Sequence, residues 1–173
     1  MRAEAKALDE FQTEIVVLLP RLRRMARVLA RNPADADDLV QVAVERALER
    51  RSQWAPGTRL DGWVFRIMKN AWIDETRSRT RKGRVFAPEA EAEGDRVADD
   101  RIASMETRLE ASAMERALAA LPEEQRLPIA LVLIEGLSYK EAAEVLEIPM
   151  GTVTSRLVRG RMALMAQFGE GGA

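Results

Sequence analysis

Basic and hydroxyl side chains gather near the end of this 173-residue sequence, where residues 150–161 read MGTVTSRLVRGR and include no acid. Arginine and hydroxyl groups hydrogen-bond to base edges and phosphate oxygens, and the free amides of a helix N-terminus can hold a phosphate. The candidate DNA-binding residues are Thr152, Thr154, Ser155, Arg156, Arg159 and Arg161. A DNA-reading helix is therefore the first hypothesis, and a helix with an incidentally basic face is the alternative.

The residues on either side predict how this helix is presented. A helix over 138–147, a short turn and a helix from Met150 have the lengths of a helix-turn-helix. Ser138 and Glu141 form a capping-box pattern at the start of the first helix. Small and apolar residues of both helices are expected to pack together: Ala142, Ala143, Leu146, Ile148, Val153 and Leu157. This packing leaves the candidate residues exposed, and Gly160 with them.

A lone reading helix of this size binds DNA weakly. A few phosphate contacts correspond to non-specific dissociation constants of about 10⁻⁴–10⁻⁶ M. Repressors overcome this weakness by forming symmetric dimers, but no coiled-coil or apolar dimer stripe is evident in the sequence. A second DNA-binding domain, or a larger protein that carries this one, would supply the missing affinity.

A second basic region precedes an acidic one. Residues 69–84 are rich in lysine and arginine, and residues 89–100 are rich in aspartate and glutamate, although the net charge of the chain is −1. Charge sorted in this way suggests separate surfaces for separate partners, while solvated faces are the simpler alternative. The basic region is the candidate for the second DNA contact.

The composition argues against catalysis. The chain contains no histidine, no cysteine and one tyrosine, which removes disulfides, thiolate nucleophiles, zinc fingers and imidazole bases together. We find no phosphate-binding glycine loop either, and so expect no enzyme activity, no metal or other cofactor and no small-molecule substrate. No apolar run reaches the roughly 18 residues of a membrane span, and the N-terminus lacks an apolar signal core. We expect a cytoplasmic protein without membrane insertion.

Helical periodicity runs through most of the chain and predicts an all-α protein. The expected helices cover about residues 11–29, 34–51 and 60–80 in a first domain, and 104–120, 123–135, 138–147 and 150–167 in a second. Pro20 either kinks the first helix or starts a new one. We expect two small helical domains, residues 8–82 and 104–168. Residues 83–103 are expected to form a flexible acidic linker, because they hold few large apolar side chains.

Four motifs in this order and spacing resemble the extracytoplasmic-function (ECF) sigma factors of bacterial RNA polymerase, in a minimal two-domain form. They are DADDLVQ at 35–41, GWVFRIMKNAWIDETRSRTRK at 62–82, LPEEQR at 121–126 and GLSYKEAAEVLEIPMGTVTSRLVRGR at 136–161. The resemblance covers about residues 10–80 and 105–166. It implies a factor that directs the core polymerase to promoters and helps to melt the DNA.

The resemblance assigns two surfaces to the first domain, which corresponds to sigma region 2. The surface expected to bind the polymerase clamp comprises Asp35, Asp37, Asp38, Leu39 and Gln41. The surface expected to bind and open the minus-ten element comprises Trp54, Arg59, Asn70, Asp74, Arg77, Arg79 and Lys82. Trp54 is a candidate for stacking on an extruded base, whereas Trp63 and Trp72 keep helical spacing with the core. Val42 replaces a glutamate that is usual in the family.

The second domain corresponds to sigma region 4, which reads the minus-thirty-five element with the helix from Met150. Thr154 and Val158 depart from the usual basic and bulky residues, so we expect a promoter sequence particular to this chain. The resemblance to the family also implies that an anti-sigma factor binds this chain and that the chain acts in a stress response. The linker either threads the polymerase or serves as a spacer. A stand-alone helix-turn-helix regulator and a helical protein-binding adaptor are the alternative functions.

Overall fold

The computed structural model describes the backbone of residues 2–83 and 105–169, and the side chains of 9–83 and 113–169. Within these ranges the chain forms helices joined by turns and contains no strand, which confirms the all-α prediction. Residues 84–103, nearly all of the expected linker, lie outside the described part. No helix in that part is long and apolar enough to cross a membrane.

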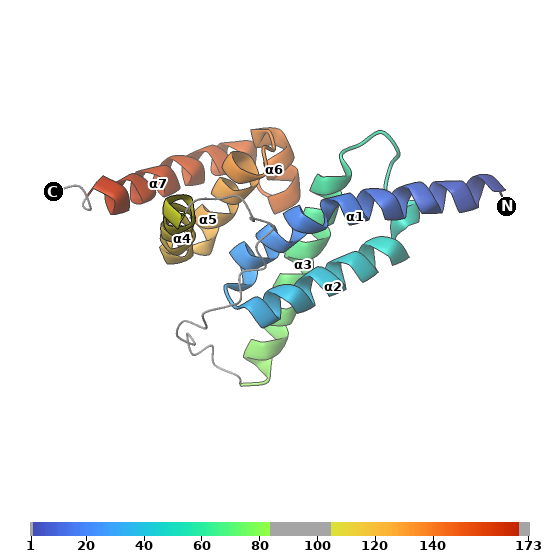
Figure 1. The fold of residues 1–173 in the computed structure, drawn as a ribbon, viewed down its shortest axis with the longest axis horizontal. Coiled ribbons are helices and arrows are strands. Elements are labelled where there is room, and N and C mark those ends of the chain that lie inside the picture. Colours follow the sequence, from blue (N-terminus) through green and yellow to red (C-terminus); the bar gives the residue numbers. More distant parts are fainter. Residues whose placement is uncertain (1, 84–104, 170–173) are drawn as a thin grey trace.

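Three long helices build the first domain and lie side by side (Figure 1). They are α1 (Arg2–Ala30), α2 (Pro33–Glu49) and α3 (Leu60–Arg81), with a short 3-10 turn, η1 (Arg51–Gln53), after α2. Helix α1 continues through Pro20, so no second helix starts there. Apolar side chains at helical spacing, among them Leu22, Met25 and Phe65, are fully buried between the helices.

A sharp break separates α1 from α2 and has a local cause. Arg31 adopts a left-handed conformation with φ of 60°, which ends α1. Asn32 then caps α2, because its side-chain oxygen accepts hydrogen bonds from the backbone amides of Ala34 and Asp35. Pro33 occupies the first turn, where its missing amide is not needed.

The second domain contains α4 (Met105–Ala120), α5 (Glu123–Ile129), the π-helical turn η2 (Ala130–Ile134), α6 (Tyr139–Leu146) and α7 (Met150–Gly169). The single helix expected over 123–135 therefore ends in a wider turn, in which the Glu135 amide donates to the Ala130 carbonyl at 2.9 Å. Gly136, with φ of 71°, then reverses the chain toward α6. The turn leaves Glu135 buried.

The two domains share one hydrophobic core in this structure. Buried residues of α1, α2 and α3 are continuous with buried residues of α5, α6 and α7. Helix α6 packs against α3, where Val145 lies beside Gly62 (Figure 1). The structure thus brings the helix-turn-helix against the first domain.

Candidate nucleic-acid and polymerase interfaces

The helix-turn-helix is held by two local devices. The capping box predicted from the sequence is present: the Glu141 amide donates to Ser138 Oγ at 3.2 Å, and the Ser138 amide donates to Glu141 Oε2 at 2.7 Å. At the other end of α6, Glu147 adopts φ of 57° and turns the chain toward α7. These devices set the direction in which α7 leaves the turn.

The outer face of α7 carries most of the predicted DNA-reading groups. Val153 and Leu157 are buried, while Thr154, Ser155, Arg159 and Arg161 are exposed. Thr152 and Arg156 are half-buried, and Arg156 Nη2 lies 3.6 Å from Glu124 Oε2. The Thr154 and Ser155 hydroxyls donate to the helix backbone, so each presents oxygen lone pairs outward.

Gly160 was expected on this exposed face, and that expectation is wrong. Gly160 is buried where α7 crosses α5. A Cβ atom added there would lie 2.6 Å from Ile129 Cδ1 and 3.3 Å from the Gln125 backbone oxygen. The glycine therefore serves close helix packing, which single-sequence periodicity does not reveal.

The C-terminal half of α3 forms an open basic surface. Arg77, Arg81 and Lys82 are exposed there. A depression of about 630 Å³ lies along this half and is lined by Asp74, Thr76, Arg77, Thr80 and Arg81. Cationic groups around an open hollow suit a nucleic-acid backbone.

Two of the predicted minus-ten residues, Asp74 and Arg79, form ion pairs with residues of α2. Arg79 donates to both carboxylate oxygens of Asp35 at 2.8 Å and to Glu75 at 2.6 Å. The Arg79 hydrogen bonds lower the pKa of Asp35 despite its partial burial. Asp74 accepts from Arg46 at 3.2 Å. The Arg79–Asp35 pair thus joins the predicted promoter surface on α3 to the predicted polymerase surface on α2.

Trp54, the candidate for stacking on an extruded base, is partly packed against the core. Its ring is half-buried against Phe11, with ring centroids 5.8 Å apart, and its Nε1 atom is buried without a hydrogen-bond partner. Trp63 also contacts Phe11, and Trp72 is only 5 % exposed. The structure confirms Trp72 as a core residue and places Trp54 at the edge of the same cluster.

Helix α2 presents its acidic residues outward. Asp37, Asp38 and Gln41 are exposed, and Gln41 donates to Glu45 at 3.1 Å. Leu39 is 5 % exposed and packs into the core instead of facing outward with them. The outward polymerase-binding candidates on this helix are therefore the polar ones.

Sequence reasoning missed a set of charged groups where the two domains meet. Glu135 has a side chain only 1 % exposed, and it accepts from Arg21 Nε at 2.7 Å and from Arg24 Nε at 3.1 Å. Arg21 Nη1 also reaches Asp61 Oδ2 at 2.8 Å. Burial opposes the ionisation of Asp61, but hydrogen bonds from Arg59, Arg21 and the Gly62 amide outweigh it and lower its pKa.

Two further ion pairs, Arg59–Glu141 and Lys69–Glu147, join this set to the helix-turn-helix. Arg59 donates to Asp61 Oδ2 at 2.6 Å and to Glu141 Oε2 at 3.2 Å. Lys69 Nζ lies 2.6 Å from Glu147 Oε2, and its hydrogen bond lowers the pKa of Glu147. Glu141 and Glu147 are 82 and 78 residues away from their partners Arg59 and Lys69, so no local spacing pointed to these two pairs.

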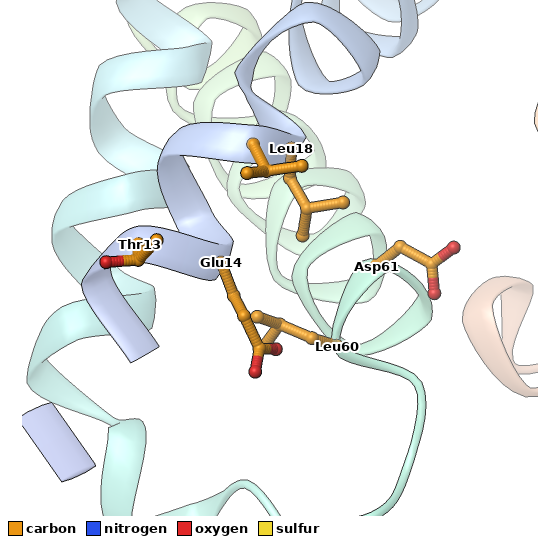
Figure 2. Close-up of a pocket in the computed structure, with 6 residues that line it drawn as sticks. Thr13, Glu14, Leu18, Leu60 and Asp61 are labelled. Carbon is orange, nitrogen blue, oxygen red and sulfur yellow. The ribbon is translucent and has the colours of Figure 1, made fainter. Parts of the chain in front are cut away.

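A pocket of about 320 Å³ lies beside this set, between α1 and the start of α3 (Figure 2). Thr13, Glu14, Val17, Leu18 and Leu60 line it together with Asp61. Figure 2 shows the Asp61 carboxylate pointing away from Thr13 and Glu14. That carboxylate is already bound by Arg21 and Arg59. Glu14 is therefore the one acid of the pocket lining without an ion-pair partner in the described part of the chain, and the lining residues do not form an acid–base pair that could act in catalysis.

Two family models match separate parts of the chain. Residues 15–82 match Sigma-70 region 2, and residues 111–164 match Sigma-70, region 4. The sigma factor EcfG of Rhodopseudomonas palustris is 33 % identical over 166 residues, which cover 95 % of this chain and 88 % of the relative. SigM of Mycobacterium tuberculosis is 35 % identical over 149 residues, with coverages of 86 % and 72 %. SigE of Mycolicibacterium smegmatis is 38 % identical, but the match spans only 56 % of that relative.

Two solved structures are similar over both domains. The sigma factor RpoE in complex with the anti-sigma factor NepR, from Bartonella quintana, has a TM-score of 0.77 at 27 % identity and covers 92 % of this chain and 96 % of its own. CnrH in complex with the cytosolic domain of CnrY has a TM-score of 0.65 at 25 % identity, with coverages of 98 % and 96 %.

A helical domain matching region 2 and a helix-turn-helix domain matching region 4 together define a sigma-70-type factor. The relatives narrow that class further. This chain belongs to the ECF sigma factors of bacterial RNA polymerase.

Proposed function

We propose that the first domain joins the core polymerase and opens the minus-ten element while the second reads the minus-thirty-five element. The observation that supports this proposal is that both domains have an exposed basic helix surface, on α3 in the first and on α7 in the second. One weak DNA contact in each domain becomes a strong combined contact when one enzyme holds both. The proposed limits are residues 8–82 and 104–168 for the domains and 83–103 for the tether.

The polymerase contact is proposed for the outward face of α2. Asp37, Asp38 and Gln41 are exposed there, and Asp35 and Leu39 hold the same helix in place through Arg79 and the core. Exposed carboxylates beyond those needed at the helix start are free to pair with basic groups of a partner.

The minus-ten contact is proposed for α3 and the loop before it. Arg77 and Lys82 would track the strand backbone, with Arg59 and Asn70 nearer the start of the helix and Asp74 and Arg79 bracing it. Trp54 would stack on an extruded base after leaving its position against Phe11. Base stacking on an aromatic ring contributes about 1–3 kcal/mol, enough to favour an open strand locally.

The minus-thirty-five contact is proposed for α7. Its candidate residues are Thr152, Thr154, Ser155, Arg156, Arg159 and Arg161. Bidentate arginine contacts to guanine would provide discrimination, and the hydroxyls would hold phosphates and bases near the helix start.

An anti-sigma factor is proposed as the partner that keeps the chain inactive. The sigma factor of the RpoE–NepR structure is bound by such a protein, and this chain is similar to that sigma factor over both domains. Release under stress would then allow this chain to join the polymerase in the cytoplasm. It would act as a polymerase subunit, with no catalytic chemistry of its own.

Run-off transcription tests the proposed function. Purified chain is mixed with bacterial core polymerase and fragmented genomic DNA, and transcripts are mapped against core polymerase alone. Discrete transcripts that require the chain support the proposal. DNA binding that proceeds equally well without core polymerase, together with no new transcript, would instead favour the stand-alone regulator.

A further inference from the structure

We infer that the second domain inhibits the first by charge mimicry. Two carboxylates of the helix-turn-helix, Glu141 and Glu147, bind Arg59, just before α3, and Lys69, in its first half. Arg59 and Asn70, the neighbour of Lys69, belong to the surface that the promoter strand would otherwise contact. The closed chain and the strand-bound chain then exclude each other. This inference rests on the proposed minus-ten role of α3.

The first occupied group is Arg59. Its Nη1 atom donates to both Glu141 oxygens, at 3.3 and 3.2 Å, and its Nε and Nη2 atoms donate to Asp61 at 3.1 and 2.6 Å. These contacts involve all three guanidinium nitrogens and leave one Nη2 hydrogen without an acceptor, so a phosphate could form a two-point contact with Arg59 only by displacing one of the carboxylates. Glu141 takes the place that the DNA backbone would take.

The second occupied position is Lys69 together with Asn70. The Lys69 side chain is only 6 % exposed, and its Nζ atom lies 2.6 Å from Glu147 Oε2. The Asn70 side chain also lies near Glu147 and contributes to the lowered pKa of that carboxyl. A nucleic-acid strand cannot reach Lys69 until α6 moves away.

A deeper contact holds α6 in this place. Glu135, buried just before α6, binds Arg21 and Arg24 of α1, and Arg21 also binds Asp61 of α3. Val145 of α6 packs on Gly62, where a Cβ would lie 3.9 Å from Val145 Cγ2. Salt screens the ion pairs of the buried Glu135 carboxylate only weakly. The pairs formed by Arg59, Glu141 and Glu147, which are partly exposed, are screened by salt more strongly.

The masking covers only half of the promoter surface. Arg77, Arg81 and Lys82, at the far end of α3, are exposed in the closed chain. DNA can therefore be captured at this end while the start of α3 is covered. Displacement of α6 then becomes the step that separates capture from strand opening.

A disulfide that locks the closed form is the first test. The chain has no native cysteine. A Cβ at Gly62 would lie 3.9 Å from Val145 Cγ2, so Gly62→Cys and Val145→Cys place two thiols beside each other across the contact of α3 and α6. The double variant is oxidised with diamide, freed of oxidant and assayed in run-off transcription with core polymerase. We expect at least a tenfold loss that dithiothreitol restores, and no redox effect in either single variant. Full activity of the oxidised form would overturn the inference.

A variant that removes only the mimicking charges is the second test. Glu141→Gln with Glu147→Gln retains the capping-box partner, because glutamine also accepts at that position. Dyes at Gln12→Cys and Gln167→Cys, both exposed, report the distance between the domains by energy transfer. We expect the variant to shift the closed–open ratio about fivefold toward open, as two weak surface pairs would. Glu144→Gln, exposed on the same helix, is the matched control.

The two tests separate this inference from the function on which it rests. Energy transfer that is unchanged in the Glu141/Glu147 variant contradicts the mimicry, whether or not transcription occurs. A wild-type chain that opens normally yet yields no transcript with core polymerase contradicts the proposed function instead. If the Gly62→Cys/Val145→Cys variant is inactive even when reduced, the disulfide test is set aside. The energy-transfer measurement on the Glu141/Glu147 variant then supports or overturns the inference by itself.

Discussion

Lys69 of α3 and Glu147 of the helix-turn-helix form a 2.6 Å ion pair across 78 residues of sequence. The lysine is buried, and Glu147 is the left-handed residue that ends α6. The turn of the DNA-reading motif is therefore anchored on the helix proposed to open DNA. The geometry of each domain is coupled to the position of the other.

Gly160→Ala should destabilise the second domain by roughly 1–3 kcal/mol, since its new Cβ would overlap Ile129 and crowd Gln125 where α7 crosses α5. Urea unfolding followed by circular dichroism measures the loss. Gly151→Ala is the control, because nothing lies within 4 Å of a Cβ there. Equal stability of the two variants would contradict the packing role of Gly160.

Ser138→Ala should cost about 1 kcal/mol of stability through loss of the α6 cap. Ser138→Asp keeps an acceptor for the Glu141 amide and should retain most of that stability. Thermal unfolding at neutral pH compares the three chains. An alanine variant as stable as the native chain would show that the capping box contributes little here.

Asp35→Asn should lower stability by about 1 kcal/mol at neutral pH, because it weakens the pair with Arg79. Pairing lowers the pKa of Asp35, so its contribution is complete at neutral pH and is lost as pH falls below the usual carboxyl range. The difference between the native chain and the variant should therefore shrink toward pH 2. Asp38→Asn, at an exposed position, should show no such difference at either pH.

Arg159→Ala should weaken promoter binding by the holoenzyme while leaving the helix content unchanged. Arg159 is exposed on α7, so its removal disturbs no packing. If Arg159 contacts a phosphate, the slope of log affinity against log salt should fall by about one. Arg159→Lys should restore the salt slope but not a bidentate base contact. Binding unaffected by either change would remove Arg159 from the interface.

Trp54→Ala should impair strand opening more than closed-complex formation, as measured by permanganate reactivity and by filter binding. Trp54→Phe is the control, because a phenyl ring still packs on Phe11 and still stacks on a base. The alanine variant should also lose some stability through the Phe11 contact. Normal permanganate reactivity in a folded alanine variant would remove the base-capture role.

The helices and the reading face could be predicted from sequence because their causes are local. Asn32 and Pro33 mark the start of α2, and Ser138 with Glu141 marks the start of α6, whatever the rest of the chain does. Apolar spacing likewise indicated that Val153 and Leu157 point inward and that Arg159 and Arg161 point outward.

Only the tertiary structure decided which charges meet and how closely helices cross. Arg21 and Glu135 are 114 residues apart, and the types of two residues do not determine which of many opposite charges each will bind. From the sequence, Gly160 was expected on the exposed face of α7 and Leu39 in the polymerase-binding surface, yet packing against other helices buries both. Local spacing fixes the direction of a side chain on its own helix, whereas its neighbours depend on how the whole chain folds back.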